Sequence, residues 1–159
     1  MSIEVNGVEL SDVTVRYLET ILWAETVSLS EAEDMLSDGF MDVAEDHPLY
    51  NVQECSPLDD HFGLGDFSVE SLKRAENDCN EFFYRLDRIG LLERANCFAD
   101  DEHIAYDFWL TRQGHGAGFW DGDYADETED IGDALTGVAR EFGECWVIVD
   151  DAGCLHIEG

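Results

Sequence analysis

The chain has 159 residues, of which 38 are Asp or Glu and only 8 are Lys or Arg, giving a formal net charge of −30. Apolar residues make up 45% of it, including nine Phe, five Tyr and four Trp, which excludes a disordered acidic tail and predicts a packed globule. The charge argues against direct binding of nucleic acid or of an anionic membrane surface, because both need cationic side chains to neutralise phosphate.

The N-terminal part predicts two helices and a loop. Residues 12–25 place Val15, Leu18, Ile21 and Leu22 on one face of a first helix. The Ser30–Glu33 segment has the pattern of a capping box that opens a second, short helix. The acids around that second helix are Glu31, Glu33, Asp34, Asp38, Asp42, Glu45 and Asp46. A loop follows, bracketed by the only two prolines, and continues to Ser68.

The middle of the chain predicts one long structural helix. Apolar residues recur in steps of three and four from Val69 to Ile89, with Ser68 as a plausible N-cap and Gly90 as the residue that ends the helix. Acids and arginines spaced i,i+4 on the outer face predict ion pairs: Glu70–Arg74, Arg74–Asp78 and Glu81–Arg85. Residues 61–98 carry seven acids and five bases, so this helix is near neutral between two parts of net −14 each.

The C-terminal part predicts the order β-β-α-β-β. The expected elements are a strand over 103–111, a glycine-rich turn, a returning strand over 117–120, a helix over 128–143 capped by Thr128, a central strand over 145–150 and a last strand over 154–158. The expected fold is therefore α+β. A single domain over 1–159 would consist of a mainly helical part, 1–98, packed with a small, mainly antiparallel sheet in the β-β-α-β-β part, 99–159.

The Gly-His-Gly turn is the strongest candidate for catalysis. His115, with Asp107 and Asp121 nearby in sequence, could act as a general base or metal ligand. No second His lies close to it, and neither a nucleophile elbow nor a P-loop is present in the sequence. We therefore expect a hairpin whose aromatics Phe108, Trp109, Phe119 and Trp120 enter the core, and no enzyme, with a small enzyme built on His115 kept as the less favoured alternative.

Metal and cofactor sites are not expected from the sequence. Asp121 and Asp123 match the first two ligand positions of a calcium loop, but Ala125, Asp126 and Gly132 depart from that pattern. The five cysteines, at positions 55, 79, 97, 145 and 154, lack zinc-site spacing and are expected to be reduced, with no Cys145–Cys154 disulfide.

Three explanations of the acidic charge compete. Rows of carboxylates can stand in for the phosphates of DNA, which would make the protein a mimic that enters the basic groove of a nucleic-acid-binding protein. The single lysine beside seven arginines also fits adaptation to high salt. The third explanation is an acidic interaction module whose partner has no link to nucleic acid.

Four stretches resemble a recurrent group of small acidic bacteriophage proteins with no established activity. They are YLETILWAET (17–26), PLDDHFGLGDF (57–67) with NDCNEFF (77–83), DFWLTRQGHGAGFWD (107–121) and ALTGVAREFGECWVIVDDAG (134–153). The third stretch is the most specific. In that group an arginine commonly follows its last Asp, whereas Gly122 stands here and leaves Asp121 and Asp123 without that positive charge. The resemblance implies a phage or mobile-element setting.

In such a setting, a small protein of net −30 is similar to anti-restriction and anti-CRISPR DNA mimics in charge only. The favoured hypothesis is a phage-type DNA mimic that blocks the nucleic-acid-binding groove of a host defence protein in the host cytoplasm. Such a mimic would not bind nucleic acid or membrane itself. The hypothesis leaves open whether the protein forms a homodimer. The partner-binding acids would be the seven around the second helix together with a C-terminal set: Asp121, Asp123, Asp126, Glu127, Glu129, Asp130 and Asp133.

Overall fold

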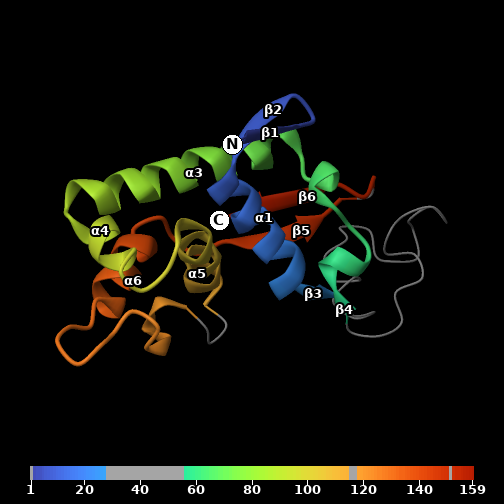
Figure 1. Cartoon of the computed structure of the whole chain (residues 1–159). Helices are drawn as coiled ribbons and strands as arrows, with labels where there is room; N and C mark the ends of the chain where they lie inside the picture. Colours follow the sequence, from blue (N-terminus) through green and yellow to red (C-terminus); the bar gives the residue numbers. More distant parts are fainter. Residues whose placement is uncertain (1, 28–55, 115–117, 151) are drawn as a thin grey trace.

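Five helices and three separate two-stranded antiparallel sheets make up the computed structural model, which describes residues 2–27, 56–114, 118–150 and 152–159 (Figure 1). The helices are α1 (Asp12–Ala24), α3 (Val69–Arg88), α4 (Leu91–Ala95), α5 (Asp101–Gln113) and α6 (Gly132–Arg140). The strands are β1 (Ser2–Val5), β2 (Val8–Ser11), β3 (Thr26–Val27), β4 (Ser56–Pro57), β5 (Trp146–Val149) and β6 (Leu155–Glu158). The predicted α+β class is confirmed. Within the described residues no helix is both long and apolar enough to cross a membrane.

The chain begins with a hairpin that the sequence analysis did not predict. Strands β1 and β2 pair from Ser2 opposite Ser11 to Val5 opposite Val8. Asn6 and Gly7 connect them with φ angles of 51° and 81°, the positive values that a tight two-residue hairpin turn requires. An Asn-Gly pair between apolar strands is the strongest short signal for such a turn, so this element was predictable.

Helix α1 confirms the first predicted helix, and the second predicted helix lies outside the described residues. Leu18, Ile21 and Leu22 of α1 are buried, as the spacing indicates. Strands β3 and β4 pair with Thr26 opposite Pro57 and Val27 opposite Ser56.

Helix α3 confirms the long central helix. The Ser68 side chain accepts a hydrogen bond from the N–H of Ser71 at 3.1 Å, and Gly90 has the left-handed φ of 78° that commonly follows a helix end. Its buried apolar stripe comprises Leu72, Ala75, Cys79, Phe82 and Leu86. Two of the predicted ion pairs form, Arg74–Asp78 at 3.7 Å and Arg85–Glu81 at 3.1 Å.

Helix α5 corrects the prediction of a strand over 103–111. The Asp100 side chain caps it by accepting from the N–H of His103 at 2.8 Å, and Gly114 ends it with a φ of 73°. From Ile104 to Arg112 every side chain except Tyr106 is buried. A helical stretch that is buried on nearly every side shows no 3.6-residue polar alternation. Its aromatic residues therefore indicated a strand, and only the two caps favoured a helix.

The prediction of a returning strand over 117–120 is also wrong. A 3-10 turn, η4 (Phe119–Asp121), occupies this position, and residues 115–117 lie outside the described part. Phe119 is buried as expected, whereas Trp120 is 36% exposed and lies under the Arg140 guanidinium at 5.8 Å. The predicted β-β-α-β-β order is thus replaced by α5, η4, α6, β5 and β6.

Helix α6 is shorter than predicted, and Thr128 does not cap it. The helix begins only at Gly132, because residues 124–131 form an irregular loop in which the Thr128 N–H and hydroxyl donate to Asp126. Among the described residues, strand β5 pairs only with β6 and therefore does not have the central position predicted for it. Asp150 and Cys154 face each other across the last hairpin, since the N–H of Asp150 donates to the carbonyl of Cys154 at 3.0 Å.

Arg112 forms the main group of polar contacts inside the core. It is 2% exposed, and its guanidinium donates to Asp78 on α3 at 2.7 Å, to the Tyr17 hydroxyl on α1 at 3.1 Å, and to the carbonyls of Phe142 and Gly143 at 2.9 and 3.1 Å. These bonds fix α5 against α1, α3 and the segment after α6.

Candidate functional site

The C-terminal set of predicted acids begins at the last residue of η4 and continues through the following loop to the first turn of α6. We call this segment the acidic loop (residues 121–133; Figure 1). The other predicted acids lie outside the described residues: Glu31, Glu33, Asp34, Asp38, Asp42, Glu45 and Asp46. The structure therefore bears on the C-terminal half of the predicted set.

Buried apolar side chains anchor the acidic loop. Tyr124 is fully buried and Ile131 is 1% exposed, and the N–H of Ile131 donates to the carbonyl of Tyr124 at 3.1 Å. Phe119, just before the loop, packs against Tyr124 with ring centroids 5.3 Å apart. These contacts hold both ends of the loop against the core.

Several acids of the loop accept hydrogen bonds from its own backbone. Asp121 accepts from the N–H of Gly118 at 3.2 Å, and Asp130 accepts from the N–H of Gly132 at 3.0 Å. Asp126 accepts from the Thr128 hydroxyl and N–H, both at 2.7 Å, and from the N–H of Glu129 at 2.9 Å. These bonds, that of the Thr128 hydroxyl first, lower the pKa of Asp126. The carboxylates therefore shape the loop as well as charging it.

The remaining acids of the loop differ in their pairing. Glu129 pairs with Arg94 of α4 at 2.9 Å, and Asp123 lies near His103. Glu127 and Asp133 are exposed and have no hydrogen-bond or ion-pair partner within the described ranges. These two acids contribute charge without a visible structural role.

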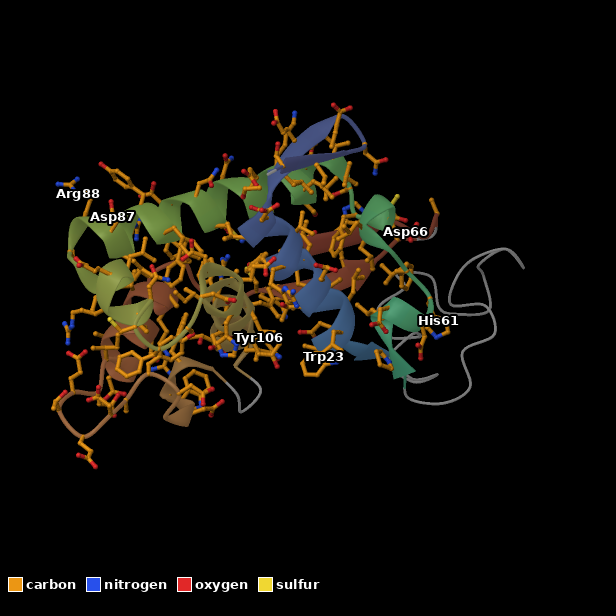
Figure 2. All side chains as sticks on the ribbon, in the orientation of Figure 1. Trp23, His61, Asp66, Asp87, Arg88 and Tyr106 are labelled. Atoms are coloured by element: carbon orange, nitrogen blue, oxygen red, sulfur yellow. The ribbon has the colours of Figure 1, made fainter. Side chains whose placement is uncertain are left out.

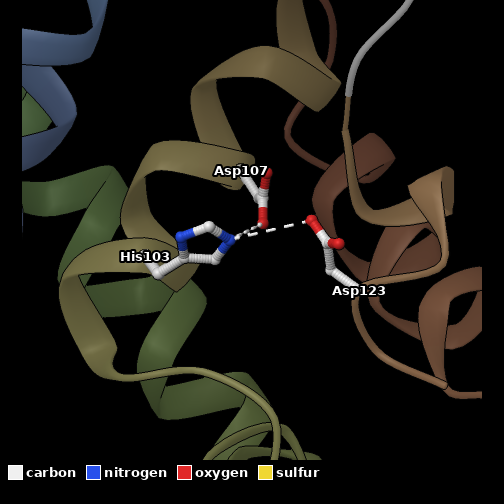
Figure 3. A group of neighbouring side chains, drawn as sticks. All are labelled: His103, Asp107 and Asp123. Atoms are coloured by element: carbon white, nitrogen blue, oxygen red, sulfur yellow. Dashed lines mark ion pairs between the residues drawn. The ribbon is translucent and has the colours of Figure 1, made fainter. Parts of the chain in front are cut away.

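A compact group of His103, Asp107 and Asp123 lies where α5 meets the acidic loop (Figure 3). The Nε2 atom of His103 is 3.2 Å from Oδ2 of Asp107 and 3.9 Å from Oδ2 of Asp123. The Asp107 side chain is only 4% exposed, whereas those of His103 and Asp123 are 45% and 63% exposed. The group is thus a buried carboxylate with two exposed neighbours.

The Asp107 carboxylate lies in an environment with opposing effects. Burial raises its pKa, the hydrogen bond from the Tyr124 hydroxyl (2.7 Å) and the nearby His103 lower it, and the charges of Asp123 and Asp121 raise it, with a net increase. No lysine or arginine pairs with Asp107 in the part of the chain that the structure describes. The carboxylate consequently has no permanent cation beside it.

The sequence pattern does not predict this group. In sequence, Asp107 stands close to His115, which lies outside the described residues. On the strand predicted over 103–111, residues four apart would share no contact partner. On a helix, His103 and Asp107 are i,i+4 neighbours. Identifying the cap at Asp100 would have revealed the pair.

A row of partly exposed rings from α1 and α5 borders the group. The Trp23 and Tyr106 rings lie 5.6 Å apart, and Tyr106 and His103 lie 5.7 Å apart. Trp23 is 56% exposed, and Figure 2 shows it beside Tyr106. The row therefore extends from the exposed Trp23 ring to His103, which lies beside the two carboxylates.

Comparisons with protein-family models, curated protein sequences and solved structures find no match for this chain. The function must therefore be argued from the residues themselves. Among the described thiols, Cys79, Cys97, Cys145 and Cys154 are free. Burial raises the pKa of Cys79 and of Cys145, which makes these two thiols poor nucleophiles.

Proposed function

We propose that the protein is a non-enzymatic, phage-type DNA mimic that places its carboxylates in the basic nucleic-acid-binding groove of a host protein. The preorganised acidic loop is the observation that carries this proposal. Three of its carboxylates are held by backbone N–H donors, and its ends are anchored by buried apolar side chains. A charged surface that is already ordered loses less conformational entropy when a partner binds.

Each of the described arginines lies against an acid or an aromatic ring, and the formal net charge remains −30 with all of the arginines counted. Five of them form ion pairs: Arg16 with Glu102, Arg74 with Asp78, Arg85 with Glu81 and Glu141, Arg94 with Glu129, and Arg112 with Asp78. Arg88 and Arg140 lie over aromatic rings. With a net charge of −30, the protein would attract a basic groove over several ångströms, and association would be fast and sensitive to salt.

Recovery of the partner from a host lysate tests the proposal. Immobilised protein at low salt should retain a nucleic-acid-binding protein, and a few hundred millimolar salt or an excess of duplex DNA should release it. Recovery of no such protein across candidate hosts, or of one that duplex DNA does not displace, would contradict mimicry.

Two pairs of charge-neutralising variants test whether the acidic loop is the contact surface. Glu127→Gln with Asp133→Asn removes two loop charges that have no partner among the described residues. Glu4→Gln with Glu70→Gln removes the same charge from β1 and from the start of α3, which lie well away from the loop (Figure 1). The loop pair should weaken binding more than the control pair; equal effects would indicate that only net charge matters.

Thermal unfolding in KCl separates mimicry from adaptation to high salt. A halophilic protein should gain stability steeply up to molar KCl, well beyond the concentrations at which screening of surface charge is complete. A mimic from a low-salt host should reach a plateau once its self-repulsion is screened.

A further inference from the structure

The His103–Asp107–Asp123 group has the donor spacing of a metal site. Imidazole nitrogen and carboxylate oxygen bind Zn²⁺ at about 2.0–2.2 Å, so two ligands of one tetrahedral ion lie roughly 3.4 Å apart. The Nε2 atom of His103 lies 3.2 and 3.9 Å from the two carboxylate oxygens, and one donor atom from each residue falls within 4.8 Å of the others. A small closure of the exposed Asp123 would bring all three donors onto one ion.

The surroundings of Asp107 supply a second, independent reason. Its side chain is 4% exposed, and no lysine or arginine of the described chain neutralises it. A carboxylate in the interior is costly unless a cation or several donors compensate it. Asp107 has one hydroxyl donor and one imidazole, which is a cation only when it is protonated. A second carboxylate, that of Asp123, faces the same point from the acidic loop, which increases the need for positive charge there.

Tyr124 provides the outer support that metal ligands commonly have. Its buried hydroxyl donates to Asp107 Oδ2 at 2.7 Å and fixes the orientation of the carboxylate. Ligating carboxylates are usually held by such hydrogen bonds, and the loss of one typically weakens metal binding by about 10–100-fold.

We infer that His103, Asp107 and Asp123 bind one divalent transition-metal ion, for which Zn²⁺ is the preferred probe. One imidazole and two carboxylates suit Zn²⁺ or Mn²⁺, whereas Mg²⁺ and Ca²⁺ favour oxygen ligands alone. Three protein ligands leave at least one coordination position for water or for a donor atom of a partner.

The bound ion would connect α5 to the acidic loop, because two ligands come from the helix and one from the loop. Metal binding would therefore stabilise the protein and restrict the loop. This inference does not depend on DNA mimicry, since a metal-binding loop would be equally consistent with another partner.

The competing explanation is that His103 is simply a protonated partner of two acids. A Zn²⁺ titration of the EDTA-treated full chain, in physiological salt with excess Mg²⁺ to occupy weak surface sites, separates the two. Calorimetry should give one tight site, and the thermal midpoint should rise with Zn²⁺. The ¹⁵N resonance of His103 Nε2, assigned by loss in His103→Gln, should shift on Zn²⁺ addition.

Variants of the exposed ligands make the test specific. His103→Gln and Asp123→Asn change side chains that are 45% and 63% exposed, so both should fold, and each should weaken Zn²⁺ binding by roughly tenfold or more. Asp133→Asn removes the same charge from α6 without touching the group and should leave the affinity unchanged. Mn²⁺, which thiolates bind poorly, should show the same ranking and so exclude a cysteine site.

Equal Zn²⁺ affinity in the wild type, His103→Gln and Asp123→Asn would overturn the inference. So would an equal loss in the Asp133→Asn control, because it would show that binding follows net charge alone.

Discussion

Replacing Arg112 by Met should destabilise the protein more than any change of surface charge. Arg112 is 2% exposed and donates to Asp78, to the Tyr17 hydroxyl and to two backbone carbonyls. Methionine fills a similar volume but leaves these acceptors without their donor. Removing one partner of a buried ion pair costs about 3–5 kcal/mol.

The lower end of that range is expected here. The Asp78 side chain is 23% exposed, so water can reach it, and Arg74 remains 3.7 Å away as a second cation. We therefore expect Arg112→Met to lower the free energy of unfolding by about 3 kcal/mol. For a chain of 159 residues this corresponds to a fall of about 6–12 °C in the thermal midpoint.

Urea unfolding followed by circular dichroism would measure the loss, and a double-mutant cycle would assign it. Asp78→Leu removes the carboxylate that Arg112→Met leaves without its partner. The double variant should therefore lose less unfolding free energy than the two single variants lose together, with a coupling energy of about 1.5–3 kcal/mol. A loss below about 1 kcal/mol for Arg112→Met, or additive effects in the cycle, would refute the role assigned to this buried pair.

Three further predictions concern α6, the last hairpin and the buried carboxylate. Gly132→Ala should destabilise the protein, because a Cβ at this position would lie 2.5 Å from the Phe119 carbonyl oxygen. Gly137→Ala on the same helix should stabilise it by about 0.5–1 kcal/mol, because a Cβ there meets nothing within 4 Å. Urea unfolding of both variants would show whether the two changes in stability have opposite signs. Burial alone would raise the pKa of Asp150, but hydrogen bonds from the His156 ring and two backbone N–H groups leave the pKa lowered. The ionised Asp150 therefore stabilises the fold fully above the unfolded pKa of about 3.9, and this stabilisation is lost as the pH falls further. Below about pH 5 the unfolding free energy of Asp150→Asn should therefore depend less on pH than that of the wild type. Asp107→Asn keeps an acceptor for the Tyr124 hydroxyl and removes a charge from a side chain that is 4% exposed. In the absence of metal, the thermal midpoint of this variant should therefore be higher than that of the wild type. A lower midpoint would contradict the energetic cost assigned to the buried charge.

The sequence predicted the helices that have one buried face and failed on α5, which is buried on nearly every side from Ile104 to Arg112. Helices α1 and α3 each have a buried stripe and a polar face, and α3 also has clear caps at Ser68 and Gly90. In helix α5 every residue from Ile104 to Arg112 except Tyr106 is buried, so this stretch carries no such alternation. Its aromatic and branched residues then favoured a strand, although packing against α1 and α3 determined the outcome.

The candidate site was predictable only in part for the same reason. The run of acids after η4 was evident from composition, but its backbone hydrogen bonds depend on a loop conformation that residue types alone do not specify. The contact between Asp123 and His103 joins a loop to a helix assigned as a strand. No rule of local spacing could bring these residues together before α5 was recognised.

Helix α5 carries two buried charges of opposite sign, and their surroundings differ in a way that bears on function. Arg112 is surrounded by a carboxylate, a hydroxyl and two carbonyls, all supplied by the described fold. Asp107 receives one neutral hydroxyl and an exposed imidazole whose charge depends on protonation. A buried charge that the fold compensates fully needs no explanation beyond structure, whereas one that it compensates incompletely, at a surface with further ligand atoms, indicates a functional position. This asymmetry is why we assign Arg112 to stability and the Asp107 group to binding.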